Sequence, residues 1–452
     1  MGKALLSVGL DVGTTSTQMI LSRLTAENRA SGFAVPKLEI TEREILYRSP
    51  VHFTPLRGQD LVDGKALRML IEQEYAAAGI TRDQVDTGAV IITGETSRKE
   101  NAQTVLRELS DLAGEFVVAT AGPDLESILA ARGAGAMERS EGKRVLHMDI
   151  GGGTSNLCLL EDGKILATGC LNVGGRLLKL DEDGRVSYRS PVLEGITRLQ
   201  VGDTPAIAQL EAVAEHLTAV LEMAAGRREP TDMLGKLTTR ETGKVWQIPE
   251  NVILSFSGGV ADCIAREHPP LAFGDIGPLL GKAIRESRLC AGAYFLGQET
   301  IRATVVGAGC HSVTLSGSTV FFQNILFPLK NIPAAVVENP RTPAAVRDAL
   351  QTQDESTVFL AIPGFHAPGY EQVKQLAGIL AEGFAERPVL VVTEADMAKA
   401  LGHCLRLRLP PDRPCLCMDG LSLHAGSYLD VGAPVGPALP VVIKTLILGG
   451  NP

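Results

Sequence analysis

An apolar segment that contains an acid and runs straight into three glycines constrains the fold of this chain more than any other feature. Residues 145–150 form the segment, with Asp149 near its end, and residues 157–160 resume the apolar pattern. This order predicts a strand, a tight turn and a second strand. Glycines inside a strand pair lose side-chain packing and cost backbone entropy. We therefore expect the bare backbone of this turn to be required by a ligand.

A bound polyphosphate would explain the glycine turn. Successive backbone N–H groups can converge on anionic oxygens, and the hydroxyls of Thr154 and Ser155 can add donors. Asp149 is placed to hold a hydrated divalent cation. For this stretch taken alone, a plain hairpin turn is the alternative. The candidate phosphate-binding residues of the turn are Gly151, Gly152, Gly153 and Thr154.

The same pattern occurs again near the N-terminus, where an apolar segment ends in Asp11 and continues into Gly13. Two copies are far less expected by chance than one. A third glycine turn follows the apolar residues 252–256 and leads into a helical pattern. These two stretches add the candidate ligand-binding residues Gly13, Thr14, Thr15, Ser257, Gly258 and Gly259.

In this order, the three turns resemble the first phosphate, second phosphate and adenosine motifs of the actin, heat-shock chaperone (Hsp70) and sugar-kinase superfamily. The resemblance implies an α/β fold in which two ribonuclease-H-like halves, as in actin-like ATPases, surround a nucleotide cleft and close on Mg-ATP. It also implies that Asp11 and Asp149 flank hydrated Mg²⁺ as metal-binding and catalytic acids. Two connecting helices rich in small residues, at 125–135 and 302–309, would then act as interdomain hinges.

Further catalytic and metal-binding candidates follow from the expected fold. A polar loop at residues 94–101 would lie beside the first phosphate turn, so Glu95 or Thr96 could reach the γ-phosphate or its Mg²⁺. A helix N-cap with a capping acid explains that loop at least as well. The first connecting helix has a glycine before its proline where Hsp70 proteins carry an acid, which leaves the hydrolytic acid open between Asp124 and Glu126. Arg176, after a glycine pair, could contact the nucleotide or lie on the surface, and we interpret it as a surface residue.

Composition fits a globular protein with more than one domain. The chain has 452 residues, of which 45% are hydrophobic and 21% charged. Its net charge of −9 gives no reason to expect a nucleic acid as partner. The apolar runs are too short to span a bilayer and no signal segment leads the chain, so we expect a cytoplasmic protein without a membrane partner. The scattered cysteines and histidines predict buried free thiols and no dedicated metal site.

The chain continues for well over a hundred residues past the second connecting helix. Strand-like segments alternate there with three helical patterns, which indicates βαβ units. The last stretch reads as turn-rich β structure and carries no catalytic constellation, which favours a docking or swivelling role. We expect a first half at residues 1–140, a second half with the adenosine motif at 141–320, and an appended α/β module at 321–452.

Four longer strings, at residues 8–18, 92–102, 147–156 and 440–447, resemble the ethanolamine ammonia-lyase reactivating factors of bacterial ethanolamine utilisation. The resemblance implies an ATP- and Mg²⁺-dependent chaperone with ATPase activity. Its partner would be ethanolamine ammonia-lyase, and adenosylcobalamin would belong to that partner. The factor would help to expel damaged cobalamin so that intact adenosylcobalamin can enter. Association with the ethanolamine-utilisation microcompartment follows from the same resemblance, and a homodimer is left open.

Two other functions stay open on the residues alone. A sugar or polyol kinase shares the first motif, but it needs an acid that deprotonates the acceptor hydroxyl. We find no recognisable sugar-binding segment in the sequence that would supply this acid. An actin-like filament ATPase is the second alternative, and the appended module argues mildly against it. The triple glycine is closer to Hsp70 and cell-division ATPases. This favours phosphate chemistry that drives a domain movement over phosphoryl transfer to a metabolite.

Overall fold

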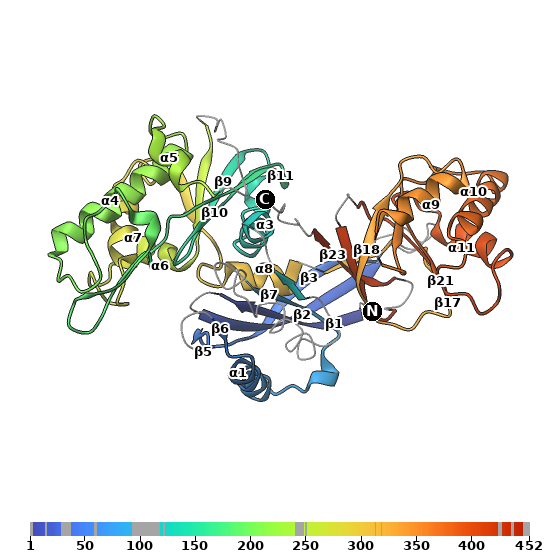
Figure 1. Cartoon of the computed structure of the whole chain (residues 1–452), viewed down its shortest axis with the longest axis horizontal. Coiled ribbons are helices and arrows are strands. Elements are labelled where there is room, and N and C mark those ends of the chain that lie inside the picture. The colour runs from blue at the N-terminus through green and yellow to red at the C-terminus, as the bar shows by residue number, and fades with distance from the viewer. Residues whose placement is uncertain are drawn as a thin grey trace.

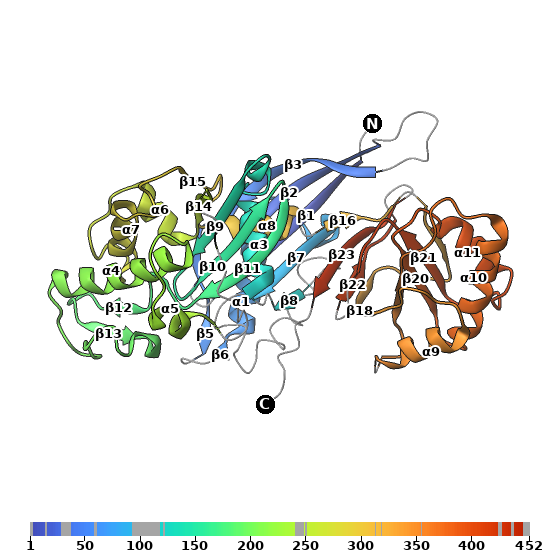
Figure 2. The same cartoon turned by 90° about the horizontal axis from the view of Figure 1, so that it is seen from above.

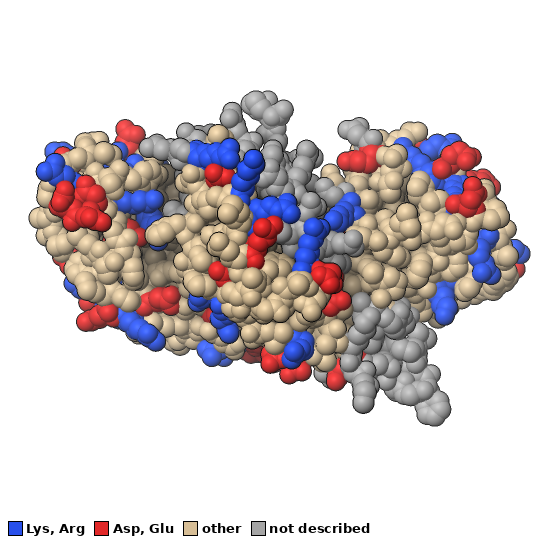
Figure 3. Space-filling model, turned by 90° about the horizontal axis from the view of Figure 1, so that it is seen from below, with Lys and Arg blue, Asp and Glu red and all other residues tan. Residues whose placement is uncertain are grey.

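The computed structural model shows a mixed α/β protein (Figure 1). It describes residues 3–13, 16–28, 38–57, 61–92, 118–120, 123–239, 248, 251–311, 313–317, 319–353, 355–423, 427–434 and 438–445. Four site candidates, Thr14, Thr15, Glu95 and Thr96, lie outside these ranges. None of the helices within the ranges has the length and apolar character needed to cross a membrane. On the face shown in Figure 3, basic and acidic side chains are interspersed among uncharged ones.

The N-terminal sheet combines a long hairpin with two parallel strands. Its elements are β1 Lys3–Val12, β2 Ser16–Asn28, β3 Leu38–Arg48, β4 His52–Phe53, β5 Leu56–Arg57, β6 Leu61–Val62, α1 Gly64–Ala77, η1 Arg82–Gln84, β7 Thr87–Ile92 and β8 Val118–Thr120. The strand order is β3-β2-β1-β7-β8, with β1 to β3 antiparallel and β7 parallel to β1. Helix α1 packs on this sheet through Leu67, Ile71 and Tyr75, which recur at helical spacing.

The second sheet repeats this strand order. Its elements are η3 Glu138–Ser140, β9 Arg144–Ile150, β10 Ser155–Glu161, β11 Lys164–Leu171, β14 Ile253–Ser257 and β15 Tyr294–Leu296. The order is β11-β10-β9-β14-β15, with β9 to β11 antiparallel and β14 and β15 parallel to β9 and to each other. Asp11 and Asp149 are each the next-to-last residue of corresponding strands, β1 and β9. The repeat therefore gives the two acids equivalent places.

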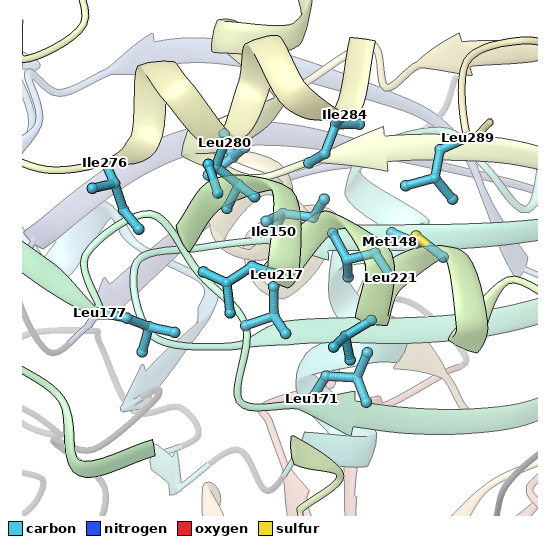
Figure 4. Packing of buried hydrophobic residues seen from close by; sticks show 14 of the residues in the cluster. Met148, Ile150, Leu171, Leu177, Leu217, Leu221, Ile276, Leu280, Ile284 and Leu289 are labelled. Carbon is cyan, nitrogen blue, oxygen red and sulfur yellow. The ribbon is translucent and has the colours of Figure 1, made fainter. Parts of the chain in front are cut away.

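Helices and a small strand pair accompany the second sheet. They are β12 Leu178–Leu180, β13 Val186–Arg189, η4 Pro191–Leu193, α4 Ile207–Ala224, α5 Asp232–Leu237, α6 Gly259–Ala265 and α7 Gly277–Glu286. In the core between them, Leu217 of α4 and Leu280 of α7 belong to one apolar cluster with Met148 and Ile150 of β9 (Figure 4). Alternate residues of a strand face opposite sides. Asp149 therefore points away from this core.

Two helices with small residues cross between the sheets. They are α3 Pro123–Gly133, which follows β8, and α8 Ala303–His311, which follows β15. α3 packs on β9, β10 and β11, and α8 packs on β1, β2 and β7, so each helix leaves one sheet and covers the other. A Cβ on Gly133 would lie 1.9 Å from Ala303 O, and one on Gly307 would lie 2.0 Å from Leu129 O. Both predicted small-residue helices are therefore present, and their close crossing requires glycine.

The C-terminal part of the chain forms one eight-stranded sheet with three helices. Its elements are β16 Val313–Leu315, β17 Phe321–Gln323, β18 Leu329–Val336, α9 Pro343–Gln351, β19 Phe359–Ile362, α10 Tyr370–Gly383, β20 Val389–Thr393, α11 Ala398–Arg406, β21 Cys415–Asp419, β22 Ser427–Val431 and β23 Pro440–Thr445. The order is β16-β23-β22-β18-β19-β20-β21-β17, with β18 to β21 parallel. The predicted βαβ alternation is confirmed.

Two features of this sheet differ from the sequence analysis. β17 is an antiparallel edge strand beside β21 and stands outside the predicted alternation of strands and helices. β16 belongs to the same sheet, although it precedes the predicted boundary at residue 321. β16 pairs with β23 and also contacts β3 of the first sheet, as Figure 2 shows. The eight cysteines are free, and all except Cys290 are buried, as predicted.

Candidate functional site

The first candidate turn lies between β1 and β2. Gly13 N donates to Ser16 O at 2.8 Å and closes the turn, whose residues Thr14 and Thr15 lie outside the described ranges. Thr54 Oγ1 donates to Gly13 O at 2.8 Å and holds the turn from outside. Asp11 precedes the turn, directly opposite Gln18 of β2.

The second candidate turn, between β9 and β10, has the same construction. Gly151 N donates to Thr154 O at 2.9 Å, and Asp149 lies opposite Asn156 of β10. A Cβ added to Gly153 would meet no atom of the described residues within 4 Å, so no contact among them explains a glycine there. The surface of this turn is bare backbone, which suits close approach of an anion.

A glycine pair after β11 braces the second turn from behind. Gly175 N donates to Gly151 O at 3.0 Å, and a Cβ on Gly174 would lie 2.4 Å from Gly152 O. Arg176 N donates to Gly152 O at 2.6 Å. Glycine is needed at 174 because two backbone segments touch there, not because of a ligand.

The interpretation of Arg176 as a surface residue is corrected by the structure. Its Nε donates to Asp275 Oδ2 at 3.0 Å, and Asp275 is only 4% exposed. The other oxygen of Asp275 accepts from Gly277 N at 2.8 Å. The Arg176 stem lies over Gly152, where an added Cβ would meet it at 3.2 Å. Arg176 therefore supports the glycine turn from a half-buried position.

Asp149 is a buried carboxylate held by two hydroxyls. Ser257 Oγ donates to Oδ1 at 2.5 Å, and Thr304 Oγ1 of α8 donates to Oδ2 at 3.4 Å. Burial raises the pKa of Asp149 to about 6, and the two hydroxyls oppose that shift. In the part of the chain that the structure describes, no basic side chain forms an ion pair with Asp149. A bound cation would compensate the buried charge.

Two buried amide oxygens beside the acids lack hydrogen-bond partners among the described residues. They are Gln18 Oε1, opposite Asp11, and Asn156 Oδ1, opposite Asp149. Such orphaned acceptors suit the water molecules of a hydrated ion. Mg²⁺ keeps several waters and binds proteins through one or two carboxylates together with phosphate oxygens. The residues at the two turns therefore fit Mg²⁺ with a polyphosphate.

The described residues contain no group of three or more His, Cys, Asp or Glu side chains that could hold a metal ion by themselves. A site formed by only one or two carboxylates agrees with that finding, because the remaining positions of Mg²⁺ are filled by water and phosphate.

The third candidate turn joins β14 to α6. Gly258 adopts φ 84, and its added Cβ would lie 2.3 Å from Ile150 O, so the backbone there requires glycine. Gly259 has more room, with its nearest neighbour, Ile301, at 3.8 Å. The Ser257 hydroxyl is directed inward to Asp149.

One short segment, residues 300–304, contacts residues at or beside all three turns. Gly258 N donates to Thr300 O at 3.0 Å, and Gln18 Nε2 donates to Ile301 O at 3.2 Å. Three residues after Ile301, Thr304 contacts Asp149. The contacts from the three turns therefore converge where the chain enters α8.

The candidate hydrolytic acids are less defined. Asp124 Oδ1 accepts from Thr168 of β11, which gives it a structural partner. Glu126 lies in the first turn of α3 and is partly exposed. Glu95 and Thr96 lie outside the described residues, so their roles stay predictions.

Sequence reasoning missed four residues that the structure adds to this region: Gln18, His147, Asn156 and Thr304. A signal existed for two of them, because Gln18 and Asn156 each stand seven residues after the acid of their turn. The position of Thr304 depends on how α8 crosses the sheets, which the local sequence does not reveal.

The described chain is thus a mixed α/β protein with two sheets of like order, meaning that their strands follow one another in the same sequence. Each sheet carries an acid-tipped glycine turn, which is a glycine turn directly preceded by a strand that contains Asp11 or Asp149. It belongs to the family described as ethanolamine utilisation protein EutA, whose model matches residues 3–449. Proteins described as ethanolamine ammonia-lyase reactivase EutA from Salmonella typhimurium and Escherichia coli are each 40% identical over 466 aligned positions. Each alignment covers 98% of this chain and 98% of the relative. The family resemblance stated from the sequence is confirmed.

The solved structures that match this chain are more distant in sequence. A Ppx/GppA family member from Aquifex aeolicus is 14% identical over 68% of this chain and 88% of its own, with a TM-score of 0.37. The ethanolamine utilisation protein EutJ from Carboxydothermus hydrogenoformans is 16% identical over 67% and 89%, with a TM-score of 0.34. Similarities of this size carry no argument about function.

Proposed function

We propose that the protein is an ATP- and Mg²⁺-dependent reactivating chaperone for adenosylcobalamin-dependent ethanolamine ammonia-lyase. It would promote the exchange of damaged cobalamin for intact adenosylcobalamin on that enzyme. The 40% identical relatives named as reactivases of this lyase support the partner. The observation that carries the nucleotide part is the pairing of each acid-tipped glycine turn with an orphaned buried amide oxygen, at Gln18 and Asn156.

We assign roles to the residues at the turns as follows. Asp11 and Asp149 bind hydrated Mg²⁺, and the Gln18 and Asn156 amide oxygens accept from its waters. Backbone amides of Gly152 and Gly153 bind the phosphates, whereas those of Gly13 and Gly151 donate within their turns and hold the backbone in shape. Gly259 leaves room for the adenosine, and Gly258 gives the backbone the shape of that turn. ATP supplies a phosphoanhydride bond whose cleavage changes the charge between the turns.

We propose that the two like-ordered sheets are the two halves of an actin-like ATPase. The reciprocal packing of α3 and α8 supports this proposal, since each helix ties one sheet to the other. Closure of the turns on ligand would shift α8 through the contact of Thr304 with Asp149. The lyase can respond only to the extent that it binds the two states with different affinities.

We further propose that the eight-stranded sheet and α9 to α11 form the module that engages the lyase. Figure 1 shows these elements at one end of the molecule, with α4 to α7 at the other end. The protein would act in the cytoplasm, with the microcompartment of ethanolamine utilisation as its site of association. A homodimer stays an open prediction.

The direct test uses purified protein with ethanolamine ammonia-lyase that has been inactivated by turnover. Mg-ATP and fresh adenosylcobalamin are added, and the return of lyase activity is followed. We expect recovery with the wild type and none without ATP. Asp11→Ala and Asp149→Ala should each abolish both ATP binding and recovery. If both activities survive these substitutions, the assignment of the site is wrong.

A further inference from the structure

A buried histidine contacts the candidate metal-binding carboxylate through a serine. His147 lies two residues before Asp149 in β9 and is 0% exposed. Its Nδ1 lies 2.9 Å from Ser255 Oγ, and its Nε2 lies 2.9 Å from Ser257 Oγ. Ser257 Oγ in turn lies 2.5 Å from Asp149 Oδ1. The four side chains form one continuous series of hydrogen bonds.

The pairing of two parallel strands builds this series. His147 lies opposite Ser255, and Asp149 lies opposite Ser257, in the register of β9 with β14. Residues two apart on a strand face the same side, so the histidine ring reaches both serines. None of the four is more than 6% exposed. Each of these polar atoms therefore depends on its protein partners.

Counting protons fixes the direction of each hydrogen bond. His147 is fully buried and both of its ring nitrogens face serine hydroxyls, so the ring is neutral and carries one N–H. A charged Asp149 only accepts, so Ser257 donates its single proton to Oδ1 and must accept from the ring. His147 therefore carries its proton on Nε2, and Nδ1 accepts from Ser255. With the other tautomer, the single proton of Ser257 would have to serve two acceptors, so its contact with either Nε2 or Oδ1 would contain no proton.

The two oxygens of Asp149 are held unequally. Oδ1 has the 2.5 Å bond from Ser257, whereas the contact of Oδ2 with Thr304 Oγ1 is 3.4 Å, which is long for a hydroxyl donor. A cation that binds Oδ2 therefore disturbs only the weaker of the two hydrogen bonds to the carboxylate.

We propose that His147 is a positioning residue for Asp149: by making Ser257 a donor to Oδ1, it fixes the carboxylate so that Oδ2 is presented to a divalent cation. The identity of the cation as Mg²⁺ rests on the proposed function. The hydrogen-bond series itself does not. Partners behind a metal ligand of this kind orient the ligand and tune its affinity.

The tautomer of His147 is the first test. The full-length protein is labelled with ¹⁵N-histidine, and long-range ¹H–¹⁵N spectra report which ring nitrogen carries the proton. The His147 signal is the one that is missing from His147→Gln. We expect a neutral ring protonated on Nε2. A ring protonated on Nδ1, or on both nitrogens at pH 7, overturns the inference. This measurement needs no nucleotide.

Paired variants then test the effect on the cation. Ser255→Ala and Ser257→Ala each remove one buried hydroxyl beside the same ring, so a purely structural role predicts equal effects. Positioning predicts that Ser257→Ala weakens Mg²⁺ binding to the protein with ATP by roughly 10- to 100-fold. Ser255→Ala should leave the affinity for Mg²⁺ unchanged. In the absence of Mg²⁺, the two variants should bind ATP with the same affinity as each other.

A second pair separates the ring from its hydrogen bonds. His147→Gln keeps a donor for Ser257 and should retain Mg²⁺ affinity, whereas His147→Leu should lose it as Ser257→Ala does. Equal losses in the two serine variants, or full Mg²⁺ affinity in His147→Leu, overturn the inference. If the wild type itself binds no Mg-ATP, the proposed function fails, and the tautomer alone decides the positioning role.

Discussion

At the scale of single residues, glycines of the candidate site are present for two different reasons. Gly174 and Gly258 are required by the protein itself, because an added Cβ would lie 2.4 Å from Gly152 O and 2.3 Å from Ile150 O. Gly153 has open space around it. The same residue type therefore serves packing at two positions, and we assign it to the ligand at the third.

Gly153→Ala tests that distinction. The thermal unfolding midpoint should stay that of the wild type, because in the part of the chain that the structure describes no atom lies within 4 Å of the new methyl group. ATP affinity should fall by roughly tenfold or more, since one misplaced contact of about 1.4 kcal/mol costs that factor. Gly174→Ala is the matched contrast and should lower the midpoint. An unchanged ATP affinity in a folded Gly153→Ala protein would remove the phosphate assignment of this turn.

Asp149 makes stability depend on pH. Its pKa is raised from 3.8 to about 6 by burial, so the folded protein binds this proton more tightly than the unfolded chain. The stability that the proton confers is complete below about pH 4 and is lost as pH rises through 6. A shift of about two units corresponds to at most about 3 kcal/mol.

Asp149→Asn should therefore be more stable than the wild type at pH 8 in the absence of Mg²⁺ and nucleotide. The difference in unfolding midpoint should vanish at about pH 4, where the wild-type carboxyl is protonated too. Asp183→Asn, at an exposed turn, is the control and should show no such pH dependence. An Asp149→Asn protein that is less stable than the wild type at pH 8 would mean that the buried charge is compensated in the free protein.

The scale of elements shows what the sequence could predict and what it could not. The sequence predicts Asp11, Asp149 and the glycine turns as ligand-binding groups, because the residues of each motif are close together in the chain. His147 was not, since its partners Ser255 and Ser257 come from a strand more than a hundred residues away. β16 was missed for a similar reason, because three residues have no periodicity and gain their structure from β23.

The crossing of α3 and α8 is the element most sensitive to added volume. Gly307→Ala would place a methyl group 2.0 Å from Leu129 O, so the helices must separate. We expect a loss of roughly 3 kcal/mol or more in stability, at the upper end for overpacking. Gly235→Ala in α5 is the matched control, because its added Cβ meets nothing within 4 Å. It should be neutral or stabilise by up to about 1 kcal/mol.

Thermal unfolding of both variants measures the difference. A Gly307→Ala protein as stable as Gly235→Ala would show that the crossing can widen at little cost. In that case, the close contact between α3 and α8 would not be the interaction that holds the two like-ordered sheets together.

At the scale of the whole molecule, α8 ends two residues before β16, the first strand of the C-terminal sheet. After β16, Ser316 N donates to Leu439 O at 2.8 Å, and Leu439 N donates to Ser316 Oγ at 2.9 Å. Leu315 also packs with Ala26 of β2 and with Ala438. A movement of α8 against the first sheet must therefore be transmitted to, or resisted by, the eight-stranded sheet.

A flexible insertion between α8 and β16 should separate ATP binding from lyase reactivation. Two glycines placed after His311 leave the three turns intact, so ATP affinity should stay within about twofold, a change of less than about 0.5 kcal/mol. Reactivation should be lost, because α8 no longer moves β16 as a connected segment. The same insertion between Glu182 and Asp183, in an exposed turn, is the control and should preserve both activities. Full reactivation with the first insertion would show that the C-terminal sheet does not act through α8, and that the lyase senses the nucleotide state from another surface.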